Sequence, residues 1–213
     1  MSDNFETWTY FSSPVYIIKK PEFLESARKI SYELLDSKRK EQPANEIYPL
    51  YNTDNFYSHK DVSNLSQYIV DTAWNILDEQ GYDMSNHRTF MDNFSCQEHL
   101  KNSGHDRHIH GSMISGFYFL DCPEGSCKLV IHEPRSAKDY MFLPEKNMNE
   151  ITHACKMIYF TPNPGTIIFT NSWLPHSFTK NESNDPFRMI HFGITARYVE
   201  SVVDQTVSEA TVI

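Results

Sequence analysis

The sequence predicts a mainly β domain, an antiparallel sandwich or barrel with two helices packed on one sheet. Three observations support this fold class. Two N-terminal segments carry apolar residues at helical spacing, and both lie before Gly81. After Gly81 the pattern changes to about eight short runs of β-branched and aromatic residues, separated by turn sequences such as CPEG, NPNPG and NESNDP. The length of 213 residues suits a single domain of this kind.

Each predicted helix has one apolar stripe and recognisable end signals. Residues 20–40 carry Pro21 in the first turn and basic residues at the end, which matches the polarity of the helix dipole. Residues 62–80 carry a second apolar stripe, and a glycine follows directly. The run 10–19 before the helices reads as a strand, and because it contains Pro14 we expect it at a sheet edge.

The remaining strands follow the second helix, after a polar and irregular stretch over 41–60. The expected strands are 87–97, 105–110, 114–121, 127–133, 138–143, 156–161, 165–170, 176–180 and 187–199. We expect one domain over 1–213, in which the strand and helices of 1–85 support a barrel formed by 86–200 and residues 201–213 form a tail.

The charge balance excludes several classes of partner. The chain has 28 acidic and 19 basic residues, a net charge of −9, and no long basic run. Such a protein is poorly suited to bind nucleic acid or anionic membranes. No apolar stretch approaches the length of a membrane span, and the start, MSDNFETWTY, does not resemble a signal peptide. We therefore expect a soluble cytoplasmic protein.

The stretch HDRHIHGSMISGFYFL, residues 105–120, places three histidines within six residues and then continues as an apolar run. In a strand, residues two apart face the same side, so Asp106, His108 and His110 are expected to share a face. Same-face neighbours lie about 6.5–7 Å apart, and two of them can lean toward one metal more easily than three in a row. Gly111 lets the chain turn away after His110. This favours His108 and His110 as ligands, with Asp106 as the rival; an exposed HxH on a surface strand is the alternative.

Two further residues extend this candidate site. His176, in PNPGTIIFTNSWLPHSF, opens a strand after a tight turn, an apolar strand and a short corner, and it is the best third ligand. Arg188, in FRMIHFGI, is surrounded by apolar residues, and an inward-facing guanidinium needs an anionic partner. That partner could be a bound dicarboxylate, or an acidic residue such as Asp185 or Glu133.

The blocks HIH, SGFYFL, PNPGTIIFTNSWLPH and the arginine of FRMIHFGI, in this order and spacing, resemble the Fe(II)- and 2-oxoglutarate-dependent oxygenases. They look most like a bacterial and phage group whose HxH motif is followed by SGxYYL, which would place the protein in a host cytoplasm if a phage encodes it. The resemblance runs from about residue 93 to residue 197. It implies a double-stranded β-helix, that is, a jelly-roll barrel, with the two N-terminal helices packed on one sheet.

The resemblance also implies roles for individual residues. His108, His110 and His176 would be the iron ligands, and Arg188 would pair with the far carboxylate of the cosubstrate 2-oxoglutarate. Asn93, in MDNFS, could point into the barrel and hydrogen-bond the cosubstrate or the substrate.

The chain departs from the family pattern at two positions. Most of the superfamily has a carboxylate where this chain has His110, so the protein would supply no negative charge to the iron. Many relatives have a tyrosine that reaches the cosubstrate where this chain has Phe119. Strand alternation turns Tyr118 to the other face, so it is not expected to substitute. The second anchor for 2-oxoglutarate therefore remains unidentified.

The implied activity is that of a dioxygenase that uses Fe(II), 2-oxoglutarate and O2 and releases succinate and CO2. The expected reaction is hydroxylation of an amino-acid side chain, free or in a protein and with prolyl among the candidates, or of a small metabolite. Two alternatives stay open. One is a three-histidine jelly-roll dioxygenase or isomerase that uses no 2-oxoglutarate, in which Arg188 would have no role. The other is a non-catalytic jelly-roll binding module.

Overall fold

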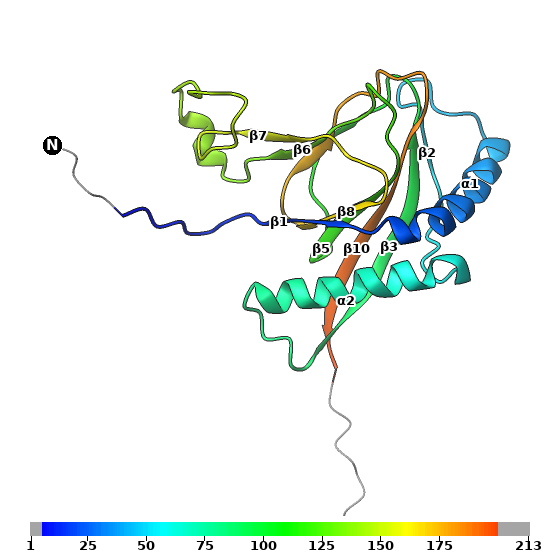
Figure 1. The fold of residues 1–213 in the computed structure, drawn as a ribbon, viewed down its shortest axis with the longest axis horizontal. Helices are drawn as coiled ribbons and strands as arrows, with labels where there is room; N and C mark the ends of the chain where they lie inside the picture. The colour runs from blue at the N-terminus through cyan, green and yellow to red at the C-terminus, as the bar shows by residue number, and fades with distance from the viewer. Residues whose placement is uncertain (1–5, 200–213) are drawn as a thin grey trace, which may run out of the picture.

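Two antiparallel sheets face each other and enclose the interior of the domain (Figure 1). The structure is a computed structural model, and it describes residues 6–199. Its elements, in chain order, are β1 (Val15–Lys19), η1 (Pro21–Phe23), α1 (Leu24–Glu41), β2 (Leu50–Asn52), η2 (Lys60–Val62), α2 (Ser63–Glu79), β3 (His87–His99), β4 (His105–His108), β5 (Ile114–Asp121), β6 (Leu129–His132), η3 (Ser136–Tyr140), β7 (Met157–Phe160), β8 (Thr166–Asn171), β9 (His176–Phe178) and β10 (Phe187–Tyr198). The six-stranded sheet has the order β1-β8-β5-β10-β3-β2, and the four-stranded sheet has the order β4-β9-β6-β7. The predicted mainly β class, a jelly-roll barrel with two added helices, is confirmed.

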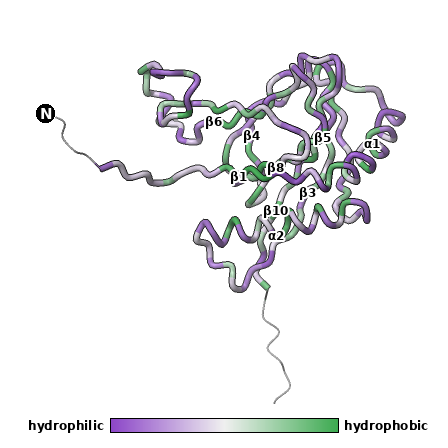
Figure 2. The backbone as a smooth tube through the Cα atoms, in the orientation of Figure 1, coloured by the Kyte–Doolittle hydropathy of each residue, from purple (hydrophilic) through white to green (hydrophobic). Residues whose placement is uncertain are grey.

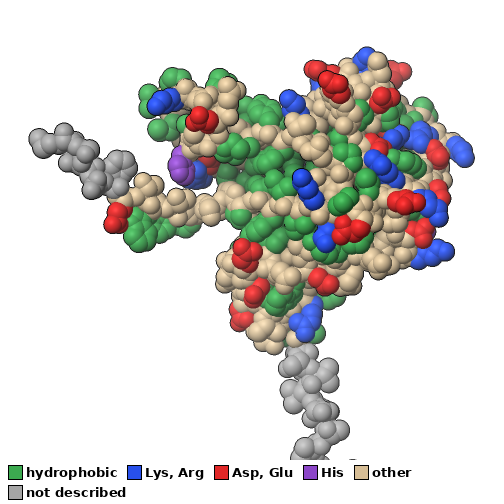
Figure 3. All heavy atoms as spheres, in the orientation of Figure 1, with side chains coloured by type: hydrophobic (Ala, Val, Ile, Leu, Met, Phe, Trp, Pro, Cys, Tyr) green, Lys and Arg blue, Asp and Glu red, His purple; other side chains and the backbone are tan. Residues whose placement is uncertain are grey.

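The two helices cover the outer face of the six-stranded sheet (Figure 1). Both helices form because apolar residues recur on one stripe, and those stripes pack against outward-facing side chains of β5, β8 and β10, among them Tyr118, Phe169 and Ile190. The basic residues in the last turn of α1 lie at the negative end of the helix dipole. Charged side chains gather over α1 on the face shown in Figure 3. Within residues 6–199, no helix has the length and apolar character that crossing a bilayer requires.

A second hydrophobic core lies between the two sheets. Phe117 and Phe119 of β5 point into it, together with side chains from β6, β9 and β10. Figure 2 shows hydrophobic colour along much of β6 and β8. Tyr118 alternates to the opposite face, where its hydroxyl donates to the carbonyl of Lys20 (2.8 Å). The prediction that Tyr118 faces away from the barrel interior is therefore confirmed.

The main differences from the prediction concern three segments. Residues 138–143 do not form a strand: Ser136–Tyr140 are a 3-10 helix, held by Lys138, whose ammonium donates to a Glu133 carboxylate oxygen and to the Cys155 carbonyl. A short strand within 41–60, β2, was not predicted, because its three residues pair only with the end of β3. The first strand begins at Val15, after Pro14, and it is an edge strand as expected. The predicted tail, 201–213, lies outside the described residues.

Candidate metal centre

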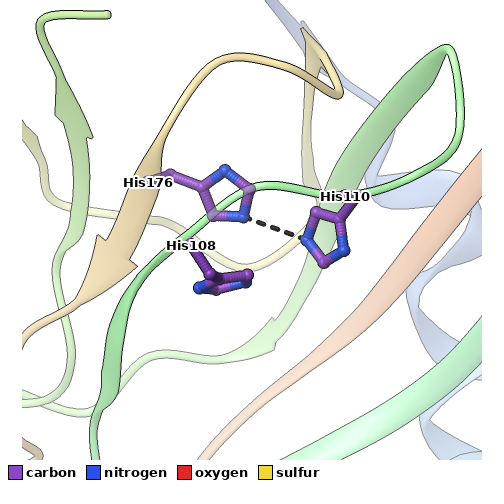
Figure 4. A group of neighbouring side chains, drawn as sticks. All are labelled: His108, His110 and His176. Atoms are coloured by element: carbon purple, nitrogen blue, oxygen red, sulfur yellow. Dashed lines mark hydrogen bonds between the residues drawn. The ribbon is translucent and has the colours of Figure 1, made fainter. Parts of the chain in front are cut away.

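Three histidines meet at the edge of the four-stranded sheet. His108 ends β4, His176 opens β9, and the two are opposite each other in the antiparallel ladder. His110 lies in the loop after β4, where its backbone N–H donates to the Ser172 carbonyl (3.0 Å). The side-chain nitrogens of the three histidines lie within 4.8 Å of one another, and the rings gather around one point in Figure 4. The structure thus brings together the three residues that the sequence predicted as ligands.

The hydrogen bonds of two rings leave their Nε2 atoms free to bind a metal. The Nδ1 atom of His108 faces the Asp106 carbonyl (2.7 Å), and that of His176 faces the Leu174 carbonyl (3.0 Å). Because a carbonyl oxygen only accepts, both Nδ1 atoms must carry the hydrogen, and Nε2 keeps its lone pair in the neutral ring. The Nε2 atoms of His110 and His176 lie 3.1 Å apart. Two ligand nitrogens with metal bonds of about 2.1 Å meeting at a right angle would lie about 3 Å apart.

The burial of these rings keeps them neutral. Desolvation lowers the pKa of His110 to about 4 and that of His176 to about 3, and it also lowers the pKa of His108. Neighbouring histidines add to each shift, because a second positive charge in the cluster would be repelled. Only the neutral imidazole can bind a metal, so the cluster is in its metal-binding form at neutral pH. The donor set, three neutral nitrogens, fits a divalent transition metal.

Asp106 does not join this cluster. It is exposed, and within residues 6–199 the group of side chains with ligand spacing contains the three histidines only. A register shift between His105 and His108 interrupts the simple alternation of β4, and the His105 ring lies 4.1 Å from the His108 ring. The structure therefore places Asp106 outside the histidine group, and the irregularity in the strand interrupts the shared face that alternation predicts. The choice between His110 and Asp106 as a ligand stays a prediction.

Arg188 lies on the opposite face of β10 from the histidines. Phe187 and Met189, its neighbours in the strand, point into the core between the sheets. Arg188 instead faces α1: its guanidinium stacks over the Tyr32 ring at 4.9 Å. The structure does not bring this arginine to the candidate metal centre. Its expected contact with a cosubstrate stays a prediction.

The partners of Arg188 are carboxylates on the two neighbouring strands. Its Nε donates to Glu98 (2.5 Å), and its Nη1 donates to Asp121 (2.8 Å). Arg39 also binds Glu98, and Arg28 also binds Asp121. The structure thus shows Arg188 in ion pairs with acidic residues of the protein. The partners are Glu98 and Asp121, whereas the sequence suggested Asp185 or Glu133. Proximity along the chain could not reveal them, because both partners come from other strands of the sheet.

Asn93 does point into the barrel, and there it contacts a histidine that sequence reasoning had left aside. The Asn93 amide nitrogen lies 2.8 Å from Nδ1 of His191. The His191 ring stacks on the His110 ring, with centroids 4.3 Å apart. Burial lowers the pKa of His191 to about 3, so this ring is neutral as well. The signal that could have identified it is strand alternation, which puts His191 on the same face as Phe187 and Met189.

Two hollows adjoin the histidine cluster. A cavity of about 30 Å³ lies inside the barrel, lined by side chains that include His108, His110, His191 and Gln97. A larger pocket of about 450 Å³ is also lined by His110. Its wall comes from the end of α2, the segment that follows it, the loop between β4 and β5, the end of β8 with the segment after it, and β10: Leu77, Tyr82, Asp83, Met84, His87, Ile109, His110, Ser112, Met113, Asn171, Trp173 and Ala196. His110 therefore lines both a small cavity and a pocket large enough for a small molecule.

Comparisons with solved structures agree with this architecture. A prolyl-4-hydroxylase from Pseudomonas putida is 12% identical, with a TM-score of 0.57 over 87% of this chain and 94% of that chain. A prolyl hydroxylase from Trichoplax adhaerens, in complex with a hypoxia inducible factor peptide fragment, is 10% identical, with a TM-score of 0.57 over 85% of this chain and 83% of that one. HygX from Streptomyces hygroscopicus, with nickel, 2-oxoglutarate and hygromycin B bound, is 11% identical, with a TM-score of 0.57 over 86% and 83%. At these identities the structures show a common fold.

The family comparison covers the segment that contains all three candidate ligands. The model of a family described as "Putative 2OG-Fe(II) oxygenase" matches residues 96–192. No curated protein matches the chain in sequence. The matched segment begins in β3 and ends in β10, so it includes both strands that carry ligand histidines. The chain is thus similar to the 2OG-Fe(II) oxygenase family over residues 96–192, and it shares its fold with solved structures of such enzymes.

Proposed function

We propose that the protein is a 2-oxoglutarate-dependent oxygenase, a hydroxylase whose Fe(II) is held by His108, His110 and His176. The observation that carries the proposal is the convergence of three neutral imidazoles, with all ligand nitrogens within 4.8 Å of one another. Bound Fe(II) and 2-oxoglutarate would supply the electrons that activate O2, which is the oxidant, and succinate and CO2 would be released. The residues of the chain hold the metal, keep its ligands in one tautomer and shape the space where substrate binds.

The backbone has a defined part in this site. The carbonyl groups of Asp106 and Leu174 hold the hydrogen on Nδ1 of His108 and His176, so each ring presents Nε2 to the metal. His110 occupies the position where relatives usually carry a carboxylate. A third neutral ligand leaves the two positive charges of Fe(II) uncompensated by the protein. We therefore expect weaker iron binding than in a site with one carboxylate, and stronger binding once the anionic cosubstrate is present.

The larger pocket beside His110 is the proposed substrate site. Its wall is mostly apolar, and Ile109, Met113 and Trp173 are each about half exposed around it, an arrangement typical of a binding surface. Among residues 6–199, the wall contains no lysine or arginine, and Asp83 is its acidic residue. An acidic substrate would find no opposite charge there, so we propose a neutral or cationic group with an apolar body. An amino-acid side chain, free or peptidyl and with prolyl among the candidates, fits this description, and so does a small metabolite.

The first test is the formation of succinate from 2-oxoglutarate by the iron-loaded protein. Purified protein is loaded with Fe(II) without air, then given O2, 2-oxoglutarate and a panel of neutral and cationic amino acids and peptides. We expect iron-dependent succinate formation, stimulated by the correct substrate. His176→Ala should remove both iron binding and turnover, and the exposed His153→Ala should change neither.

The two alternatives predict other results in the same experiment. Stoichiometric metal binding without succinate formation, with any member of the panel, would favour a three-histidine enzyme that uses no 2-oxoglutarate. Failure to bind metal would favour a non-catalytic module. Arg188 no longer distinguishes these cases, because its ion pairs with Glu98 and Asp121 give it a structural role in all of them.

A further inference from the structure

One ring nitrogen beside the candidate metal centre lacks a partner. Among the described residues, Nε2 of His191 is buried and makes no hydrogen bond. The side chain is only 8% exposed, so water from outside does not compensate it. A buried polar group without a partner costs folding free energy, so each one calls for an explanation, and a bound ligand is one of them.

Asn93 determines which nitrogen of His191 carries the hydrogen. The Asn93 amide nitrogen donates toward the Ser95 hydroxyl (3.3 Å) and toward Nδ1 of His191 (2.8 Å). Because an amide nitrogen is a donor, Nδ1 of His191 must accept, and the hydrogen of the neutral ring is on Nε2. The unpartnered atom is therefore a hydrogen-bond donor. A donor of this kind recognises an oxygen atom.

The surroundings of His191 indicate where that oxygen would lie. The ring forms part of the wall of the 30 Å³ cavity, together with His108, His110 and Gln97. A cavity of this size accommodates about one water-sized group. The ring is fixed by its stacking on His110, at an interplanar angle of 27°, and by Phe117 at 5.6 Å. The wall of this cavity thus contains two of the proposed ligands and the His191 ring.

We infer that Nε2–H of His191 donates a hydrogen bond to an oxygen of 2-oxoglutarate bound beside the histidines, and that Asn93 is the positioning residue that holds His191 in this tautomer. The inference rests on the proposed function, since it requires a metal at His108, His110 and His176. This hydrogen bond would give the cosubstrate a contact with the protein. The two contacts that the family pattern suggests are not at this site, because Arg188 faces α1 and position 119 is a phenylalanine. The side-chain amide of Gln97, in the same cavity wall, is a second donor.

The test measures binding and does not depend on turnover. Ni(II), which does not activate O2, is titrated into the protein by calorimetry, and 2-oxoglutarate is then titrated into the nickel-loaded protein. His191→Phe keeps an aromatic ring for stacking and removes the donor. We expect it to bind Ni(II) within about threefold of the wild type and to bind 2-oxoglutarate about tenfold more weakly or worse. His191→Gln restores a donor and should recover most of the lost affinity.

His99 provides a matched control in the same barrel. It is also fully buried, its Nε2 also lacks a partner among the described residues, and its Nδ1 pairs with the Ser103 hydroxyl (3.0 Å). It packs near Phe178 and Phe187 and does not line the 30 Å³ cavity. His99→Phe should therefore leave 2-oxoglutarate affinity unchanged, and circular dichroism of every variant checks the fold.

The possible failures separate the inference from the function. If the wild-type protein binds no Ni(II), the proposed function fails first. If the wild type binds both ligands and His191→Phe binds them equally well, the inference is overturned while the function stands. If His191→Phe loses Ni(II) as well, His191 acts by supporting His110, and the inference is again overturned. Should His191→Phe not fold, Asn93→Leu tests the same tautomer argument and should weaken 2-oxoglutarate binding without loss of Ni(II).

Discussion

The two faces of β10 carry different chemistry. On the outer face, Arg188 binds two carboxylates and stacks on Tyr32, and the residues beyond it join the core under the helices. On the inner face, His191 lies against His110, and its Nε2 has no partner among the described residues. On the outer face, the charged groups of Arg188 and its partners are paired with one another. On the inner face, the Nε2–H donor of His191 has no partner among the described residues.

This difference indicates which polar groups stabilise the fold and which serve a ligand. Glu98 is 1% exposed, and a buried carboxylate without a partner would be costly, so the arginines that contact it are needed for stability. The histidines instead remain neutral because burial lowers their pKa. A cluster of neutral nitrogens gains most of its binding partners only when a metal and its ligands arrive. The two faces should therefore respond to mutation in opposite ways.

The largest expected effect is the loss of metal from the inner face. With Ni(II) at about a thousand times its dissociation constant, the wild-type protein should gain roughly 4 kcal/mol of stability. His110→Ala should abolish this gain, because it removes one of three ligands, and should leave the metal-free stability nearly unchanged. Asp106→Asn should keep the gain, because Asp106 is exposed and outside the ligand group. Thermal unfolding with and without Ni(II) measures both; the reverse pattern would restore Asp106 as the second ligand.

The next effect belongs to the outer face. Arg188→Met should lower the free energy of unfolding by roughly 3 kcal/mol, because Glu98 and Asp121 each lose a partner in a partly buried site. Binding of Ni(II) and of 2-oxoglutarate should stay within about threefold of the wild type when measured below the melting temperature. Chemical denaturation and calorimetry provide the two readouts. A large loss of 2-oxoglutarate affinity at unchanged stability would return Arg188 to the cosubstrate role.

A smaller effect is expected at the edge of the same ion-pair network. The Tyr32 hydroxyl donates to Asp121 (2.6 Å), and burial together with this bond raises the pKa of Tyr32 to about 12. Tyr32→Phe removes one hydrogen bond to a charged group and should cost about 1–2 kcal/mol of stability, without effect on Ni(II). Urea denaturation at neutral pH measures this. A weakening of Ni(II) binding would show that the two faces of β10 are coupled.

The smallest effect is expected for His105. The centroid of its ring lies 4.1 Å from the centroid of the His108 ring, but His105 is not a member of the ligand group. His105→Ala should change Ni(II) affinity by no more than about threefold and stability by no more than about 0.5 kcal/mol. Calorimetric titration would reveal a larger change, which would add a fourth histidine to the site.

Local pattern was enough to predict much of the fold. The stripes of α1 and α2 and the inward and outward residues of β5 follow from periodicity, because the hydrophobic effect acts on whichever side chains share a face. The 3-10 helix at Ser136–Tyr140 could not be predicted in this way, because the contacts of Lys138 with Glu133 and Cys155 decide it. The short β2 likewise exists only because β3 is beside it.

The sequence by itself determined the class of the fold, the three histidines and their approximate spacing, since these depend on residue type and on the period of a strand. The tertiary structure alone decided which polar groups have partners. It turned Arg188 toward Glu98 and Asp121, which are distant in the chain, and it brought Asn93 and His191 together on adjacent strands. Pairing between strands sets these contacts, and pairing is a property of the assembled sheet. The sequence thus identifies the candidate ligands. The register of β10 in the sheet decides which β10 residues lie near those ligands.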